Sequence, residues 1–374
     1  MSQKPKHVIF CTSGIFPMAI GGIQRHSKLL IEELAKTKSL QLTVIHPHTE
    51  KVFDETLGIK EVSIPFNHAA KGNYLRNCYK YSALVYDVVM QHPEAIIYSQ
   101  GLSVWHGIKK FRHRLIYNPH GLEPFQGITV RDRLSTFPFR MVLRNIFKHA
   151  AYVVSLGGKL TDILKEKAGV DLKKIVVLPN AVNLPPAFTK NFEHSKLNLL
   201  FVGRFAHNKG IDLLLETIKE LNGEGYEEKL HFSFVGKGPL FETLTAQYTF
   251  PNLTFAGFAD DDKLRQMYID NDVFVFPTLF EGMPTVVLEA MCYEMPVIVS
   301  DVGATAELVD ESNGILIEKN NKEQLKKAII KMATMPVAER KKSALTSFEK
   351  VKQRFTWQQV ALQHINFFEK IKTF

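Results

Sequence analysis

The chain has 374 residues, of which 45% are hydrophobic, and its formal net charge is +9. A chain of this length is expected to form two domains, each able to bury its own core. It has no run of about 18 apolar residues, which excludes a membrane-spanning helix. The three cysteines lack the spacing of a metal or redox motif, which favours a reducing compartment. We therefore expect a cytoplasmic protein.

The positive charge is concentrated in the first half of the chain. Residues 1–185 contain 25 Lys and Arg against 13 Asp and Glu, a net charge of +12, whereas residues 186–374 contain 22 against 25, a net charge of −3. A basic half attracts nucleic acid, anionic lipid or an acidic substrate, and charge alone does not distinguish these partners.

Strand-like apolar runs alternate with helical runs through the first half. The strand-like runs are 7–11, 42–47, 61–66, 95–101, 114–124, 151–157 and 174–183, and the helical runs are 23–36, 71–90 and 131–149. Alternation of this kind is typical of an α/β fold. The tyrosine-rich run 71–90 fits either an ordinary packed helix or part of an acceptor-binding or membrane-facing surface.

Two strand ends in the first half carry candidate binding residues. Gly21 and Gly22 precede a helix without the spacing of a dinucleotide fingerprint, but adjacent glycines let a ligand approach the backbone closely. A plain flexible turn is the alternative. His120 and Gly121 end another strand-like run. A lone histidine is more often structural, but its position at a strand end favours a functional role.

Residues 131–149 predict an amphipathic basic helix. The cations Arg140, Arg144 and Lys148 recur every four residues beside the apolar residues Met141, Val142 and Ile146. One interpretation is a surface that meets an anionic bilayer carrying a lipid-linked acceptor. A core-packed helix with a solvated cationic face fits the pattern equally well.

In the second half, three strand-to-loop segments precede a fourth such turn. They are 202–212, 230–240 and 253–264. The first carries Arg204 and Lys209 after a strand end, where α/β folds place ligands. In the third, the run Asp260–Asp262 could be mistaken for a metal-binding Asp-x-Asp motif, but it precedes a helix and predicts an N-cap.

The fourth segment, 273–292, combines a buried strand, a turn and a helix. Pro284 marks the helix start, so Glu281 lies in the turn and Glu289 in the second helical turn. The N–H groups and positive dipole end of the helix would bind an anion, typically a phosphate. Eight residues at helical rise span about 12 Å, which does not suit a glycosidase pair and predicts two acceptors for different parts of one elongated ligand. A surface turn acid and a solvated helix glutamate are the alternative.

The stretch Glu281–Gly–Met–Pro–Thr–Val–Val–Leu–Glu289 resembles the Glu-x7-Glu motif of the retaining glycosyltransferases of family 4, also called glycosyl transferases group 1. The resemblance covers nearly the whole chain and is most specific from Val202 to Asn313. It implies a GT-B fold, in which two Rossmann-like domains with parallel sheets face a central cleft. The implied parts are an acceptor-binding domain 1–185, a hinge linker 186–197, a donor-binding domain 198–355 and a terminal helix 356–374 that crosses back to the first domain.

The resemblance also implies roles for individual residues. Charge that develops on a leaving diphosphate needs fixed positive groups, and Arg204 and Lys209 match the family's phosphate-binding pair. Glu281 resembles the residue that contacts donor-sugar hydroxyls, Glu289 the acceptor of ribose hydroxyls, and His120 the histidine that reaches the donor sugar. The implied catalytic set is His120, Arg204, Lys209 and Glu281. The implied donor-binding set is Gly21, Gly22, Arg204, Lys209, Gly257, Phe258, Gly282, Met283, Pro284, Thr285 and Glu289.

The implied activity is the retaining transfer of a hexose or N-acetylhexosamine from a nucleotide-diphosphate sugar to a hydroxyl of a glycan or lipid-linked acceptor, in bacterial envelope polysaccharide or lipopolysaccharide synthesis. UDP is favoured over GDP because the family uses it more often. We expect no cofactor and no obligatory metal ion. The basic domain predicts peripheral binding at the inner face of the cytoplasmic membrane.

Three alternatives differ in class. They are a nucleotide-sugar-binding protein without transferase activity, a sugar phosphorylase of the same fold, and a basic module that binds nucleic acid or membrane. The intact motif residues argue against the first, and the chain length against the second. The sequence has no recognisable nucleic-acid-binding motif, so we expect no nucleic-acid partner.

Overall fold

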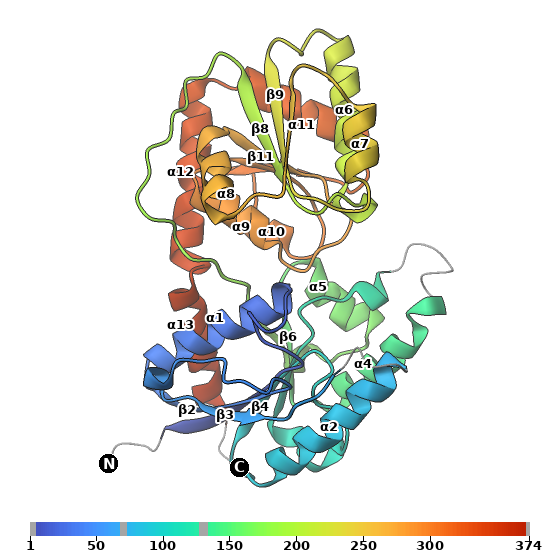
Figure 1. Ribbon diagram of the computed structural model, residues 1–374, viewed down its shortest axis with the longest axis vertical. Coiled ribbons are helices and arrows are strands. Elements are labelled where there is room, and N and C mark those ends of the chain that lie inside the picture. Colours follow the sequence, from blue (N-terminus) through green and yellow to red (C-terminus); the bar gives the residue numbers. More distant parts are fainter. Residues whose placement is uncertain (1–4, 68–72, 127–133, 372–374) are drawn as a thin grey trace. The chain divides into compact units, whose positions relative to one another are not determined.

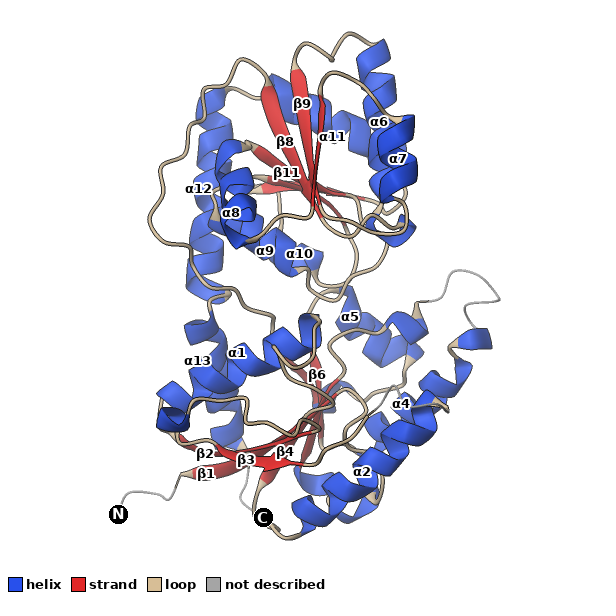
Figure 2. Ribbon diagram, in the orientation of Figure 1, coloured by secondary structure: helices blue, strands red, loops and turns tan. Residues whose placement is uncertain are grey.

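The computed structural model describes residues 5–67, 73–126 and 134–371. The chain divides into two compact units, the first made of Met1–Asn180 with Trp357–Phe374 and the second of Ala181–Thr356. Each unit has helices on both faces of a wholly parallel sheet, which confirms the expected fold class (Figure 2). The beginnings of the helices predicted at 71 and 131 lie outside the described residues.

The sheet of the first unit has the strand order β3-β2-β1-β4-β5-β6-β7. Its strands are β1 (Lys6–Cys11), β2 (Leu40–His46), β3 (Lys60–Ser63), β4 (Ile96–Gln100), β5 (Leu115–Asn118), β6 (Tyr152–Ser155) and β7 (Ile175–Val177). The central strands β1, β4 and β5 are almost wholly buried, as expected where helices cover both faces of a parallel sheet. The order reverses between β1 and β4, so the connections after these two strands leave in opposite directions.

The last helix of the chain belongs to the first unit. The helices of this unit are α1 (Gly22–Lys36), α2 (Tyr74–Met90), α4 (Phe137–His149), α5 (Lys159–Asp162) and α13 (Trp357–Lys370). α13 packs against α1, where Trp357 lies edge-on to His26 with 5.3 Å between ring centroids (Figure 1). Nζ of Lys6 donates hydrogen bonds to the carbonyl oxygens of Phe368 and Glu369, at 3.0 and 2.8 Å.

The second unit repeats the same topology in the strand order β10-β9-β8-β11-β12-β13. Its strands are β8 (Leu197–Val202), β9 (Leu230–Val235), β10 (Leu253–Gly257), β11 (Val273–Phe276), β12 (Val297–Ser300) and β13 (Gly314–Ile317). Its helices are α6 (Ile211–Gly223), α7 (Phe241–Gln247), α8 (Asp261–Asp270), α9 (Thr285–Cys292), α10 (Thr305–Leu308), α11 (Lys322–Thr334) and α12 (Val337–Arg354). Here the strand order reverses between β8 and β11.

The stretch predicted as a hinge, 186–197, is anchored to the second unit. Nζ of Lys190 donates to the carbonyl oxygens of Tyr268 and Tyr293, both at 2.9 Å, and burial lowers the pKa of Lys190 to about 7. The ring of Phe188 packs against that of Tyr293, with 5.3 Å between centroids.

The structure corrects the predicted basic helix in one respect. α4 begins at Phe137, where Pro138 in its first turn has no N–H to donate and suits a helix start, and the predicted start at residue 131 lies outside the described residues. The side chain of Met141 was expected on the apolar face but is 52% exposed, whereas Val142 and Ile146 are buried. The buried face of α4 is therefore narrower than the sequence pattern indicates.

Two short features of the second unit differ in how well the sequence predicts them. Oδ1 of Asp260 accepts the N–H of Lys263 at 2.9 Å, which confirms the predicted N-cap of α8. β12 and β13 are not predictable from the sequence, because a four-residue apolar run cannot be distinguished from a helix segment by its pattern. None of the described helices is both long enough and apolar enough to cross a bilayer.

A buried arginine holds the turn between α2 and β4. Arg114 is 3% exposed, and its guanidinium donates to the carbonyl oxygens of Val89, His92 and Ala95, at 3.1, 2.6 and 2.8 Å. These acceptors belong to the end of a helix and the following turn, where carbonyl groups have no intrahelical partner. One cation thus bonds to three backbone acceptors of the turn, two of which, the carbonyl oxygens of Val89 and His92, also accept the N–H groups of His92 and Ala95.

Replacing this arginine is predicted to destabilise the first unit. Arg114→Met keeps an apolar side chain of similar length but removes all three hydrogen bonds, so we expect a loss on the order of 3 kcal/mol in the free energy of unfolding. Both tryptophans, Trp105 and Trp357, lie in the first unit, so tryptophan fluorescence during urea unfolding reports on that unit. Arg112→Met, at an exposed neighbouring position, is the matched control, and equal effects of the two substitutions would contradict the assignment.

A chain of hydrogen bonds connects α13 to the loop after β5. Nδ1 of His364 bonds to the carbonyl oxygen of Val360 at 2.8 Å, and its Nε2 lies 3.2 Å from the Tyr98 hydroxyl. That hydroxyl accepts from Nδ2 of Asn118 at 3.0 Å, and Oδ1 of Asn118 accepts the N–H of His120 at 2.9 Å. All four hydrogen bonds can form at the same time if the His364 proton is on Nδ1 and the Tyr98 hydroxyl donates to Nε2. The last helix therefore helps to orient the backbone of His120.

Three histidines of the first unit are buried in neutral form. Burial lowers the pKa of His364 to about 4 and that of His120 to about 3. It lowers the pKa of His26 well below its usual value, and the neighbouring His120 adds to this effect. The rings of His26 and His120 meet edge to face with 4.7 Å between centroids.

These histidines are predicted to make the first unit sensitive to acid. Each has a pKa near 6.5 when unfolded and a lower one when folded, so below pH 6.5 the unfolded state binds more protons and stability falls as the pH falls. The loss continues to about pH 4 for His364 and about pH 3 for His120. Its slope reaches at most about 1.4 kcal/mol per pH unit for each histidine.

Urea unfolding followed by tryptophan fluorescence, at about pH 7 and about pH 5, measures this loss. His364→Gln, which does not titrate, is expected to lose less stability between the two pH values than the wild type. His149→Gln, on the partly exposed end of α4, is the control and should behave as the wild type. Identical pH dependence in His364→Gln and the wild type would show that buried carboxylates or other groups cause the loss.

Candidate functional site

The candidate donor site of the second unit lies where its strand order reverses. Lys209 follows β8 and Glu281 follows β11, and these two strands are neighbours whose connections leave in opposite directions. Doubly wound sheets bind ligands at this point, beyond the carboxyl ends of the strands. Nζ of Lys209 lies 2.5 Å from Oε1 of Glu281, and Oγ1 of Thr278 lies 3.2 Å from the same oxygen. The Lys209 and Glu281 side chains are 23% and 13% exposed, so the ion pair is largely shielded but reachable.

Backbone contacts fix the turn that carries Glu281. The carbonyl oxygen of Asn208 accepts the N–H of Leu279 and the hydroxyl of Thr278, both at 2.9 Å. On the other side of the turn, the carbonyl oxygen of Gly282 accepts the N–H of Ala304 at 2.8 Å. The turn is therefore bonded to the loop after β8 and to the loop after β12.

Two glycines make this close approach possible. A Cβ atom on Gly210 would lie 1.9 Å from the carbonyl oxygen of Pro277, and one on Gly303 would lie 2.3 Å from that of Glu281. Both glycines also have positive φ values, 68° and 56°, which other residues rarely adopt. Neither position can accept a side chain without moving the Glu281 turn.

The first turn of α9 presents backbone N–H groups at the same edge of the sheet. Pro284 is the N-cap and no described side chain caps the helix. The N–H of Val287 bonds to the Pro284 carbonyl oxygen at 3.2 Å, and the N–H groups of Thr285 and Val286 before it are available to an anion. Among the predicted phosphate-turn residues, Gly282 is partly exposed, Met283 and Pro284 are buried, and Thr285 is exposed. The structure thus places all four residues at the helix start that the sequence predicts.

Glu289 lies one turn further along α9 and is held by a tyrosine. Its Oε2 accepts a hydrogen bond from the Tyr268 hydroxyl at 3.0 Å. The ring of Tyr268 stacks on that of Tyr293, with 5.2 Å between centroids and an interplanar angle of 6°. Burial and the nearby Glu289 charge raise the pKa of Tyr268 well above its usual value, so its hydroxyl stays protonated and donates.

The remaining predicted donor-binding residues of this unit lie on neighbouring loops. Arg204 is exposed after β8, and its side chain makes no hydrogen bond or ion pair with any described residue. Gly257 ends β10 with a φ of 67°, and its carbonyl oxygen accepts the N–H of Gly236 at 2.7 Å. Phe258, which follows, is 75% exposed. The structure places Gly257 at the carboxyl end of β10, and Arg204 and Phe258 just beyond the ends of β8 and β10.

In the first unit, Gly21 and Gly22 lie at the start of α1. Gly21 is the N-cap, no described side chain caps the helix, and its first turn contains no acidic residue. A Cβ atom on Gly22 would meet nothing within 4 Å, which leaves the helix start open to a ligand. The positive end of the α1 dipole is therefore not neutralised by a side chain of its own first turn.

His120 lies in the loop after β5, at the same edge of this sheet. Its φ of 58° is left-handed, and its backbone N–H is bonded to Asn118 as described above. The ring is 9% exposed, and its Nε2 has no hydrogen-bond partner among the described residues. Because its pKa is lowered to about 3, the ring is neutral at pH 7 and can exchange only neutral hydrogen bonds with a ligand.

Three residues that contact the predicted site residues are not identified from the sequence. Thr278 binds Glu281, Tyr268 binds Glu289, and His26 packs on His120. Thr278 could have been found from its place between Pro277 and the motif glutamate. Tyr268 and His26 lie on other elements, and no local pattern links them to their partners.

Comparisons with known proteins agree with this architecture. The sequence profile of "Glycosyltransferase Family 4" matches residues 20–185, and that of "Glycosyl transferases group 1" matches residues 196–335, so the two together cover most of the chain. An uncharacterized glycosyltransferase of Methanocaldococcus jannaschii is 22% identical over 99% of both chains. A putative teichuronic acid biosynthesis glycosyltransferase of Bacillus subtilis is 31% identical over 48% of this chain and 46% of its own.

Solved structures with little sequence identity share the fold. Sucrose-phosphate synthase of Thermosynechococcus elongatus superposes with a TM-score of 0.75 at 19% identity, covering 98% of this chain and 99% of that one. An Anabaena protein solved with UDP and glucose gives a TM-score of 0.65 at 16% identity, covering 98% and 100%. The fold is GT-B, as the sequence resemblance implies.

Both halves of the chain thus match the same family in sequence, and the motif glutamates lie at the strand-order reversal and on the helix beside it. The chain belongs to glycosyltransferase family 4 and is a glycosyltransferase.

Proposed function

We propose that this glycosyltransferase moves a hexose or N-acetylhexosamine from a nucleotide-diphosphate sugar, with UDP favoured, to a hydroxyl of a glycan or lipid-linked acceptor. The observation that carries the proposal is the Lys209–Glu281 ion pair next to the open start of α9. It puts a cation, a carboxylate and backbone N–H groups at one edge, which suits a diphosphate joined to a sugar. Some relatives bear names linked to envelope or lipid glycan synthesis, such as the putative teichuronic acid glycosyltransferase of B. subtilis and the yeast phosphatidylinositol N-acetylglucosaminyltransferase subunit.

The reaction that we propose needs charge stabilisation at the leaving diphosphate. The bond between the anomeric carbon and the phosphate oxygen breaks, and the acceptor oxygen bonds to the same face of the carbon. The acceptor proton passes to an oxygen of the leaving diphosphate. Arg204, Lys209 and the N–H groups of the α9 start would bind the growing negative charge, where charge-assisted hydrogen bonds are worth about 1.5–3 kcal/mol each.

Lys209 is suited to bridge the two halves of the donor. An ammonium group has three donor hydrogens, and in the structure one of them is directed at Oε1 of Glu281. The others can bind a phosphate oxygen while the carboxylate is retained. Glu281, kept in place by Lys209 and Thr278, would then accept from sugar hydroxyls, and Glu289 from the ribose hydroxyls.

A donor-binding screen tests the assigned roles. Calorimetric titration with UDP, GDP and ADP is expected to show one preferred nucleotide. Glu289→Gln and Arg204→Gln should each weaken its binding by about 10- to 150-fold, because each loses a charge-assisted hydrogen bond. Glu242→Gln and Lys219→Gln change exposed residues on α7 and α6 and serve as charge-matched controls.

Failure of all three nucleotides to bind would reject the donor site. Binding that is unchanged in both site variants would reject the assigned residues. Transfer to an acceptor, with the anomeric configuration of the product determined by NMR, distinguishes a retaining transferase from an inverting enzyme and from a protein that binds nucleotide sugars without transferring them.

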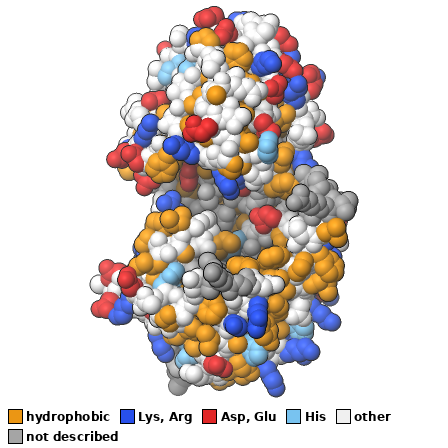
Figure 3. Space-filling view, turned by 45° about the vertical axis from the view of Figure 1, so that its right-hand side comes forward, with side chains coloured by type: hydrophobic (Ala, Val, Ile, Leu, Met, Phe, Trp, Pro, Cys, Tyr) orange, Lys and Arg blue, Asp and Glu red, His pale blue; other side chains and the backbone are white. Residues whose placement is uncertain are grey.

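We also propose that the first unit binds an anionic membrane through α4. Phe137 and Met141 are 53% and 52% exposed, and Arg144 and Lys148 continue the same stripe of the helix. The ring of Tyr74 on α2, itself 50% exposed, lies 6.1 Å from that of Phe139, so α2 extends the surface. In the view of Figure 3, the visible face of the first unit has hydrophobic side chains gathered near Lys and Arg side chains. Apolar side chains beside cations suit the interface of an anionic bilayer.

Liposome flotation tests this surface. Each basic residue near an anionic bilayer contributes about 1 kcal/mol, so the double variant Arg144→Gln/Lys148→Gln should lower the partition coefficient by about 30-fold. Lys219→Gln/Lys229→Gln, in the second unit, removes the same charge and should have no effect. The proposal is rejected if wild-type protein floats equally well with neutral and anionic vesicles, or with neither.

A further inference from the structure

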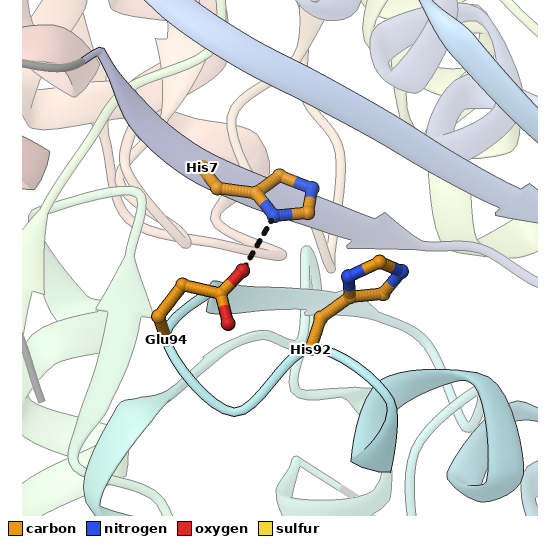
Figure 4. Close-up of side chains that lie close together, drawn as sticks. All are labelled: His7, His92 and Glu94. Atoms are coloured by element: carbon orange, nitrogen blue, oxygen red, sulfur yellow. Dashed lines mark hydrogen bonds and ion pairs between the residues drawn. The ribbon is translucent and has the colours of Figure 1, made fainter.

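Three side chains of the first unit converge at the sheet edge opposite the candidate sugar-binding residues. His7 is the second residue of β1, while His92 and Glu94 lie in the turn between α2 and β4. β1 and β4 are parallel neighbours, with Val8 paired to Ile96. The cluster therefore lies at the amino ends of these strands (Figure 4). Gly21, Gly22 and His120 follow the carboxyl ends of β1 and β5.

The distances within the cluster suit one small cation. Nδ1 of His7 lies 3.4 Å from Oε1 of Glu94, and the ligand atoms of all three residues lie within 4.8 Å of one another. An ion with four ligands at about 2.0–2.1 Å in tetrahedral array needs ligand atoms roughly 3.4 Å apart. The two imidazole rings meet at 82° with 5.1 Å between centroids, and Figure 4 shows a His92 nitrogen turned toward the His7–Glu94 pair. Small side-chain rotations would complete the geometry.

The second nitrogen of His7 is hydrogen-bonded to a buried hydroxyl, which can fix the tautomer of the ring. Nε2 lies 2.9 Å from Oγ1 of Thr43, which is fully buried. When Nε2–H donates to this hydroxyl, Nδ1 directs a lone pair at the Glu94 carboxylate, and a cation between them removes the repulsion. The other tautomer, with Nδ1–H donating to Glu94, describes a plain hydrogen-bonded pair.

The turn that carries the other two ligands is rigid. Arg114 donates to the carbonyl oxygens of Val89, His92 and Ala95, on both sides of the turn. Pro93 fixes the backbone between His92 and Glu94. His92 is partly exposed and the Glu94 side chain is 54% exposed, so an ion can enter from solvent.

We infer that His7, His92 and Glu94 bind one divalent transition-metal ion of the zinc class, with solvent in the fourth position. Two imidazole nitrogens and one carboxylate oxygen suit Zn²⁺ and not Mg²⁺ or Ca²⁺, which prefer all-oxygen sites. The ion would link the start of β1 to the α2–β4 turn and stabilise the first unit. It takes no part in sugar transfer, and the inference does not depend on the proposed donor or acceptor.

Zinc binding to the whole protein tests this site. After removal of metals with a chelator, calorimetric titration with ZnCl₂ should show one strong site that MgCl₂ does not fill. Free zinc at about 100 times Kd should raise the Tm of the first unit, followed by tryptophan fluorescence, by about 5–10 °C. Co²⁺ in place of zinc should give the visible absorption bands of a four-coordinate site.

Two variants and one control decide the outcome. His92→Ala and Glu94→Gln change exposed or partly exposed turn residues, so they should fold normally and bind zinc at least about tenfold more weakly. His113→Ala, which removes an exposed histidine of the same unit, should bind zinc as the wild type does. Equal affinity in the two site variants and the wild type would overturn the inference, since the ion would then be bound elsewhere. Absence of zinc binding to the wild type would also overturn it and leave His7 and Glu94 as a hydrogen-bonded pair.

Discussion

The carbonyl oxygen of Asn208 accepts two hydrogen bonds on which the geometry of the donor site depends. Both come from the segment after β11, one from a backbone N–H and one from the Thr278 hydroxyl. Reversal of the strand order at β8 and β11 makes the connections after these strands diverge, so nothing in the sheet itself holds the two loops together. The shared acceptor does so, and the absence of a Cβ atom at Gly210 lets the backbones meet. Lys209 and Glu281 can form their ion pair because the chains beneath them are already in contact.

The first unit uses the same topology but holds its loops in a different way. Its carboxyl edge is organised by buried side chains that connect α13, β4 and β5, rather than mainly by hydrogen bonds to backbone carbonyl oxygens of neighbouring loops. Such a network is satisfied only while its histidines stay neutral, because a buried imidazolium would need a partner for its extra proton. The two units therefore combine the same order of strands with loops that are held by different kinds of hydrogen bond. As a result, the second unit offers a ligand the backbone N–H groups at the start of α9, and the first unit offers the neutral imidazole of His120.

Much of the fold follows from the sequence because its signals are local. Apolar runs alternating with amphipathic helices predict the parallel sheets, and the turn before Pro284 predicts the start of α9. Asp260 predicts the N-cap that the structure confirms. Short strands such as β12 and the exposed side of Met141 are not predictable, because tertiary packing decides them. The residues that bond to Glu281 and Glu289 are equally difficult to predict from the sequence. Tyr268 lies on a different helix from Glu289, and the pairing of Lys209 with Glu281 joins positions 72 residues apart.

The place of α13 in the first unit has a consequence for synthesis on the ribosome. The second unit, Ala181–Thr356, is contiguous and can fold as soon as its last residue emerges. The first unit is synthesised before the second but lacks Trp357, His364 and the acceptors for Lys6 until α13 has also been synthesised. The apolar face of α1 that α13 covers therefore stays exposed while the whole second unit is made. Of the two units, the one whose synthesis starts earlier is thus the one that can complete its folding only later.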